Sequence, residues 1–89
     1  MKTSLMDVRR RLQNEKTFGN WEELSTGGRR YWYEVDGHSR WKAKYCKEVD
    51  SEEVTVSFHQ EIYDGSGNLR QIHRKYPVDL GHQEIGGDE

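Results

Sequence analysis

The sequence has few of the residues that usually stabilise or anchor a small protein. It contains one cysteine, Cys46, and one proline, Pro77. One cysteine cannot form an internal disulfide, which favours a protein of a reducing compartment. The chain has no run of about 20 apolar residues for a membrane span, and its start is too polar for a signal peptide. We therefore expect a cytoplasmic protein that makes no membrane contact.

Aliphatic residues are also scarce, and neither sign of charge dominates. Leu, Ile, Val and Phe together occupy sixteen of the 89 positions, while 14 basic residues face 16 acidic ones. Such a low apolar content predicts disorder only when net charge is high or aromatics are few. Here the net charge is −2, and the chain holds three Trp, five Tyr and two Phe. We expect a folded domain with an aromatic-rich core, on which nucleic acid would need a local basic patch.

The N-terminal residues 4–16 show the pattern of an amphipathic helix. Ser4 can serve as the N-cap, and Leu5, Val8 and Leu12 recur at i, i+3 and i+7. A helix this short is marginally stable alone. We therefore expect its apolar stripe to pack against the rest of the domain.

After a turn at residues 25–28 the apolar period changes to two, which is typical of strands. The alternation predicts four strands, over residues 29–35, 40–46, 54–63 and 69–76. Consecutive strands separated by short polar turns form hairpins.

The predicted fold class is therefore α+β, with an N-terminal helix packed on a four-stranded antiparallel meander. Three or more strands with a covered face meet the requirement for independent stability. Residues 1–81 are expected to form the single domain, and residues 82–89 a flexible C-terminal tail.

The last predicted hairpin brings together residues suited to acid–base chemistry. If the strands beside loop 64–68 pair without irregularity, His59 faces His73, and both lie on the side that carries Glu61 and Lys75. Two histidines can serve as base and acid, and a lysine can hold a phosphate. This arrangement would suit a metal-independent ribonuclease. The alternative, which we favour, is that these are ordinary residues of a solvent-facing sheet surface.

A second candidate surface combines basic and aromatic side chains. Arg40, Lys42 and Lys44 alternate along one strand, and Trp32 lies on the strand before it. Basic groups beside aromatic rings can follow a phosphate backbone while the bases stack. The alternative is a solvated polar face that keeps the sheet soluble and discourages edge pairing.

The spacing of potential metal ligands predicts neither a metal site nor a cofactor. No Cys-x-x-Cys or His-x-x-x-His is present, and the ligand-type residues considered are far apart: His38, Cys46, His59, His73 and His82. The pairing of His59 with His73 would allow a zinc site with Glu61, which we disfavour.

Cys46 has two interpretations. Lys44 and Lys47 are near in sequence and would lower the pKa of its thiol, giving a reactive thiolate. No resolving cysteine or assigned base accompanies it, so an unreactive thiol, either buried or at a sheet edge, is the favoured interpretation.

Several short motifs between Tyr31 and Pro77 carry a resemblance to known proteins. They are Arg40-Trp41-Lys42 with Tyr45, the run from Phe58 to Asp64 with Gly67 and Leu69, and the run from His73 to Pro77. This half of the chain resembles small, β-rich, mostly uncharacterised prokaryotic proteins, some of which accompany antitoxin-like partners. Members with toxin behaviour tend to carry Arg-Tyr-Asp and His-x-His, where this chain has Lys44-Tyr45-Cys46 and His59-Gln60-Glu61. The resemblance therefore bears on the fold more than on an activity.

Two functions follow as expectations. The favoured one is a non-enzymatic binding or regulatory module that acts through protein contacts or as a homodimer. The small core, exposed aromatics such as Trp32 and open edge strands support it. The alternative is an RNA-directed protein, either a binder or a metal-independent ribonuclease-type toxin, that uses Lys42, Lys44, His59, His73 and Lys75.

Overall fold

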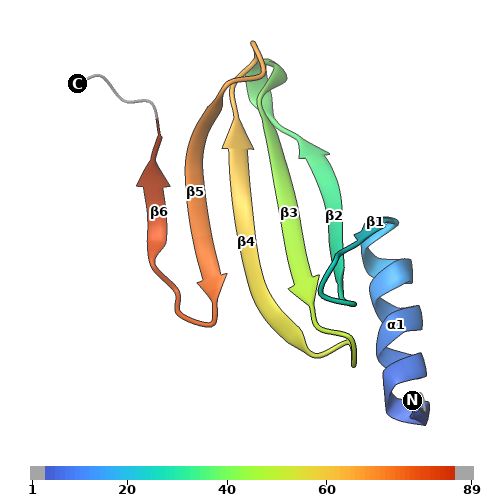
Figure 1. The fold of residues 1–89 in the computed structure, drawn as a ribbon. Helices are drawn as coiled ribbons and strands as arrows, with labels where there is room; N and C mark the ends of the chain where they lie inside the picture. Colours follow the sequence, from blue (N-terminus) through green and yellow to red (C-terminus); the bar gives the residue numbers. More distant parts are fainter. Residues whose placement is uncertain (1–3, 86–89) are drawn as a thin grey trace.

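The computed structural model describes residues 4–85, which form one α-helix and a six-stranded antiparallel sheet (Figure 1). The helix α1 spans Leu5–Phe18. The strands are β1 (Asn20–Glu23), β2 (Arg29–Asp36), β3 (Lys42–Val49), β4 (Thr55–Tyr63), β5 (Leu69–Tyr76) and β6 (Gly81–Glu84), with a short 3-10 helix η1 (His38–Arg40) before β3. The sheet order follows the chain from β1 to β6, so each strand pairs with the next.

The prediction of a four-stranded meander is wrong, because β1 and β6 add one strand at each edge of the sheet. β1 is joined to β2 by a turn in which the Leu24 amide donates to the Gly28 carbonyl at 2.9 Å. β6 pairs with β5 and includes the first residues of the predicted tail. Both edge strands have four residues without apolar alternation, and they form because a neighbouring strand offers free backbone groups. Residues 86–89 of the predicted tail lie outside the described part of the chain.

The ends of α1 follow directly from local sequence. The Ser4 hydroxyl accepts a hydrogen bond from the Asp7 amide at 3.1 Å, and the Ser4 amide donates to the Asp7 carboxylate at 3.4 Å. This capping box confirms the predicted start of the helix. The helix ends at Phe18, two residues beyond the expected end at residue 16. Its C-cap is Gly19, whose φ of 79° is readily adopted by glycine.

The face that α1 turns toward the sheet differs from the predicted one. Leu5, Val8 and Leu12 are 66%, 41% and 60% exposed, whereas Asn14 and Phe18 are buried. Phe18 continues directly through Gly19 into β1, and this chain connection fixes which side of the helix meets the sheet. The expectation that the leucine stripe packs on the domain is therefore wrong.

The core consists mainly of aromatic rings, as the composition predicts. Phe18, Tyr31 and Val49 are buried, and the partly buried rings of Tyr33, Tyr45 and Phe58 pack against them. The rings of Tyr33 and Tyr45 stack across β2 and β3 with centroids 4.9 Å apart. These cross-strand contacts bury large surfaces in a chain that has few aliphatic residues.

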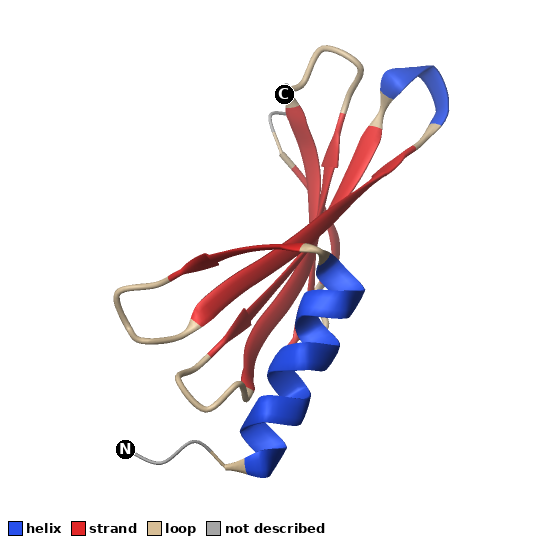
Figure 2. Ribbon diagram, turned by 90° about the vertical axis from the view of Figure 1, so that its right-hand side faces the viewer, coloured by secondary structure: helices blue, strands red, loops and turns tan. Residues whose placement is uncertain are grey.

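α1 covers only part of the sheet face on which it lies. It packs beside β1 and β2, while β4, β5 and β6 extend away from it (Figures 1 and 2). The same face of β3 and β4 therefore stays open toward solvent. Among residues 4–85, no helix has the length and apolar character that crossing a membrane requires.

Candidate binding groove

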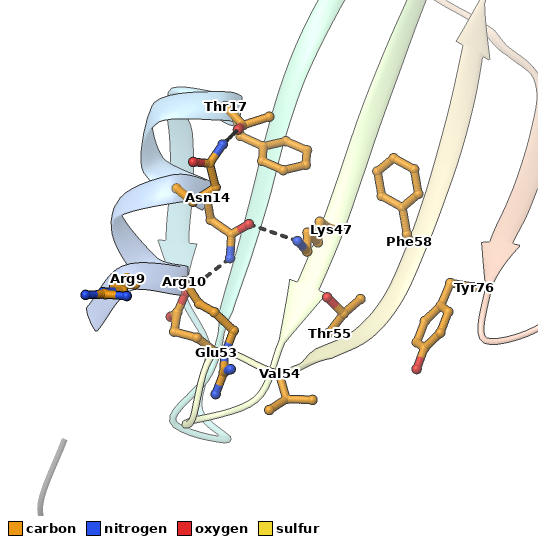
Figure 3. Close-up of a pocket in the computed structure, with 12 residues that line it drawn as sticks. Arg9, Arg10, Asn14, Thr17, Lys47, Glu53, Val54, Thr55, Phe58 and Tyr76 are labelled. Carbon is orange, nitrogen blue, oxygen red and sulfur yellow. Dashed lines mark hydrogen bonds between the residues drawn. The ribbon is translucent and has the colours of Figure 1, made fainter. Parts of the chain in front are cut away.

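The open part of this sheet face forms a groove with α1. Its volume is about 970 Å³, and Figure 3 shows helix residues on one side and sheet residues on the other. The lining residues described are Arg9, Arg10, Gln13, Asn14, Thr17 and Phe18 of α1, with Lys47, Glu53, Val54, Thr55, Phe58 and Tyr76 of the sheet and its β3–β4 turn. The groove exists because the helix stands at one edge of a wide sheet.

Apolar side chains form most of the groove surface. Phe18 and Phe58 approach each other edge to face, with ring centroids 6.4 Å apart. Tyr76 and Val54 line the groove further from the helix and are 48% and 46% exposed. Exposed aromatic surface next to a core is typical of sites that bind another apolar group.

A buried polar network holds the helix side of the groove in place. Asn14 accepts a hydrogen bond from Lys47 Nζ at 2.9 Å and donates one to Glu53 Oε1 at 3.3 Å. The Tyr31 hydroxyl donates to the same carboxylate oxygen at 2.7 Å, and Arg11 forms an ion pair with the other oxygen at 3.5 Å. Burial lowers the pKa of Lys47, and the charge of Glu53 opposes this effect. These contacts fix Asn14 and Lys47 in place beneath the groove.

Positive charge is in excess around the groove. Three of the lining residues are basic and one, Glu53, is acidic. Arg10 forms an ion pair with Asp7 at 2.9 Å, yet its Nε is buried without a hydrogen-bond partner among the described residues. Within residues 4–85 Arg9 takes part in no ion pair, and Lys75 holds its ammonium 6.0 Å from the Phe58 ring centroid. The groove is therefore an apolar surface with a basic border.

The structure separates the two histidines that the sequence places together. Tyr63 and Leu69 do pair as expected, but the next pair is Ile62 with Gln71, which leaves one extra residue in β5. His73 therefore lies opposite Gln60 rather than His59. Because adjacent residues of a strand point to opposite faces, the two imidazoles lie on opposite sides of the sheet, and the predicted pairing is wrong.

Each histidine has its own carboxylate partner. His59 Nε2 lies 2.7 Å from Glu61 Oε2, and the Tyr63 hydroxyl donates to the other oxygen of Glu61 at 2.6 Å. Burial would raise the pKa of Glu61, but the hydrogen bonds from Tyr63 and His59 outweigh it and hold the pKa below its usual value.

The other two candidates of the catalytic set lie on the groove face. His73 Nε2 is 2.6 Å from Asp79, and the ring of His82 lies 4.4 Å from that of His73. Lys75 points over the rings of Tyr45 and Phe58. The four catalytic candidates thus divide into one pair on each face of the sheet.

The predicted basic face lies on the side of the sheet opposite the groove, together with many carboxylates. Arg40, Lys42 and Lys44 share a depression of about 430 Å³ with Glu34 and Asp64. Arg40 belongs to η1 rather than to a strand.

Two basic residues of that face, Lys44 and Arg30, are already engaged. Lys44 reaches over the ring of Trp32 at 5.3 Å, and Arg30 bridges Glu22 at 2.7 Å and Glu48 at 3.0 Å. The positive charge on this side of the sheet is therefore largely balanced.

Cys46 is buried, in agreement with the favoured interpretation of its thiol. Burial, followed by the charge of Glu61, raises the pKa of Cys46 to about 11, and the nearby Lys44 only partly opposes this. The thiol lies on the same side of the sheet as His59, which is its direct cross-strand neighbour.

Comparison with protein-family models, curated proteins and solved structures finds no match. Function is therefore inferred from the geometry of the groove and of the opposite face. Sequence reasoning missed the groove because it expected the helix to lie across the sheet. The period-two pattern around Phe58 predicts that its ring lies on the core face of the sheet. No pattern in the sequence predicts that α1 stands at the edge of that face rather than across it.

Proposed function

We propose that this chain is a protein-binding domain whose groove takes up an amphipathic segment of a partner protein. The observation that carries this proposal is an apolar groove with a basic border, left open beside α1. A segment that fits it has apolar residues on one side and acidic residues along its flank. Helix-in-groove recognition of this kind uses apolar anchors at i, i+3, i+4 and i+7.

The apolar part of the groove supports a protein ligand. Phe58 and Tyr76 offer aromatic surface beside one another, and aromatic residues carry much of the binding energy at protein interfaces. No histidine or cysteine occurs among the described residues that line the groove. Its composition therefore suits binding rather than acid–base or thiol chemistry.

The charge of the border supports an acidic flank on the ligand. Among residues 4–85, neither Arg9 nor Lys75 forms an ion pair, and the Lys75 ammonium lies over the Phe58 ring, so both can meet an incoming carboxylate. Complementary charges at a rim raise the rate of association and reject wrongly charged partners.

A second copy of this chain fits the groove less well than an acidic partner. Its own exposed leucine stripe lies on α1, which carries four basic and two acidic residues, a net charge of +2. A basic helix would be repelled by the basic border. RNA is also a less suitable ligand, because the groove is lined mainly by apolar surface.

Mapping of amide shifts by NMR tests where ligands bind. The probe is a designed helical peptide of 14 residues, the length of α1, with leucines on one side and glutamates on the flank. The matched control replaces each glutamate by lysine, and a third sample contains a short mixed-sequence RNA. We expect the acidic peptide alone to shift amides around Phe58, Tyr76 and Arg9.

Other outcomes would overturn the proposal. Shifts produced by RNA at these residues, without shifts by the peptide, would favour the RNA-directed alternative. A mass that rises to twice that of the chain as protein concentration increases, together with concentration-dependent shifts of the groove amides in the absence of any ligand, would favour a homodimer.

A further inference from the structure

Three residues with different metal-binding atoms meet on the sheet face opposite the groove. Cys46 of β3 and His59 of β4 are direct cross-strand partners, and Glu61 follows two positions later on the same face. The Cys46 sulfur, a ring nitrogen of His59 and a carboxylate oxygen of Glu61 all lie within 4.8 Å of one another. This is the one group of three such residues found in the described part of the chain.

We propose that Cys46, His59 and Glu61 form a site for a divalent zinc-class ion. Thiolate, imidazole and carboxylate are the three side-chain ligands that zinc uses in proteins. A catalytic or exchangeable zinc ion takes three protein ligands and keeps a fourth position for another group. The site is independent of the groove and of the function proposed for it.

The spacing of the three atoms is close to that of a tetrahedral site. Zinc–ligand bonds of about 2.0–2.3 Å place the ligand atoms of one tetrahedron roughly 3.3–3.6 Å apart. In this structure the distances between the three ligand atoms run from 2.7 Å, between His59 Nε2 and Glu61 Oε2, to no more than 4.8 Å. Side-chain rotations on two paired strands can cover this difference without movement of the backbone.

The charges of the site also match a divalent ion. On binding, the Cys46 thiol loses its proton to solvent, and the resulting thiolate and the Glu61 carboxylate together carry two negative charges. They neutralise the ion in a site where Cys46 is buried and the side chains of His59 and Glu61 are only 26% and 19% exposed. A neutral assembly avoids the cost of a net charge in a partly buried place.

A supporting contact already orients one ligand. The Tyr63 hydroxyl donates to Glu61 Oε1, which leaves Oε2 directed at His59 Nε2. An ion bound between these two atoms would replace their 2.7 Å hydrogen bond, and the imidazole would keep its proton on Nδ1. Such outer contacts hold ligating carboxylates in place, and their loss typically weakens metal binding by about 10–100-fold.

Titration of the full chain with cobalt(II), followed by displacement with zinc, tests the site. Cobalt bound to a thiolate gives a charge-transfer absorption band in the near ultraviolet, so the readout reports Cys46 itself. Isothermal titration calorimetry then gives the zinc affinity. We expect one ion per chain, and a loss of about tenfold or more in affinity for Tyr63→Phe.

Single-residue variants distinguish metal binding at this site from metal binding by other histidines of the chain. His59→Gln and Glu61→Gln are expected to abolish the thiolate band, whereas His73→Gln, on the opposite face and also paired with a carboxylate, keeps it. Circular dichroism verifies that each variant remains folded. Zinc binding that is equal in His59→Gln and the parent chain, or the absence of any thiolate band with cobalt, would overturn the proposal.

Discussion

The hydroxyl of Tyr31 donates a 2.7 Å hydrogen bond to the carboxylate of Glu53, and both residues are buried. The acceptor comes from the β3–β4 turn, and Asn14 of α1 donates to the same oxygen. One carboxylate thus links the helix, β2 and a turn in the region where the groove begins. The stability of the groove depends on this contact.

Replacing Tyr31 by phenylalanine tests how much that hydrogen bond contributes to the stability of the fold. Tyr31→Phe removes one donor from a buried carboxylate, and a hydrogen bond to a charged group contributes about 1.5–3 kcal/mol. We expect a loss of this size in the free energy of unfolding, measured by urea denaturation. Tyr63→Phe is the control, because its hydroxyl also donates to a carboxylate, that of Glu61, but in a partly exposed place. Equal losses in the two variants would contradict the account.

Alkaline pH should destabilise the fold through the same residue. Burial, reinforced by the hydrogen bond to Glu53, raises the pKa of Tyr31 from 10.0 to about 12. The unfolded chain therefore loses this proton first, so stability is complete below pH 10.0 and falls between 10.0 and about 12. The measurement is the free energy of unfolding against pH, with tyrosinate absorbance recorded in parallel. Tyr31→Phe should flatten this fall, and an unchanged slope would refute the assignment.

The orientation of α1 predicts a large difference between two apolar residues of the helix. Phe18→Ala removes a ring from the core and should cost about 3–5 kcal/mol of unfolding free energy. Leu12 is 60% exposed, so Leu12→Ala should change it by at most about 0.5 kcal/mol. Denaturant unfolding of both variants measures the difference. A cost for Leu12→Ala comparable to that of Phe18→Ala would mean that the leucine stripe is the packed face.

Gly28 is a position where the backbone leaves no room for a side chain. A Cβ atom there would lie 1.9 Å from the carbonyl oxygen of Val49, whereas one at Gly37 would come no closer than 3.4 Å to the backbone of Trp41. Gly28→Ala must therefore push two paired strands apart, and we expect a cost of about 3 kcal/mol. For a chain of this size this lowers Tm by more than about 10 °C. Gly37→Ala should keep Tm nearly unchanged. Similar Tm values for both variants would contradict the close contact between Gly28 and the Val49 carbonyl.

Much of the central fold can be predicted because local sequence determines it. Ser4 starts the helix as expected, and the alternation of large and charged residues marks the inner strands. The register of the last hairpin cannot be predicted in this way. One extra residue, Arg70, between the pairs Tyr63–Leu69 and Ile62–Gln71 moves the following residues of β5, His73 among them, to the other face. A second irregularity, between His59 and Phe58, then pairs Tyr76 with Phe58.

The edge strands and the helix orientation depend on tertiary contacts rather than on local pattern. β6 has the sequence Gly-His-Gln-Glu, which carries no strand preference, and it pairs because β5 presents free backbone groups. α1 has an apolar stripe at Leu5, Val8 and Leu12, yet it packs through Asn14 and Phe18. The groove follows from this orientation, and for that reason the sequence does not reveal it.

The proximity of Cys46 to His59 could not have been found from regular hairpin pairing. The β3–β4 ladder begins with Val49 opposite Thr55, and regular pairing outward from there would place Cys46 opposite Phe58. An irregularity between Glu48 and Val49 leaves Val56 extra in β4 and brings Cys46 opposite His59. Neither a spaced motif nor strand alternation signals this irregularity.

The most direct test of the proposed function is a calorimetric comparison of two peptides with two proteins. The parent chain should bind the acidic leucine peptide at least about tenfold more tightly than its lysine counterpart, a difference of about 1.4 kcal/mol. The double variant Arg9→Glu/Lys75→Glu, which reverses charge beside the groove, should reverse this preference, while Arg40→Glu on the other face should leave it unchanged. Equal affinity of the parent chain for both peptides, or binding of neither, would contradict the account.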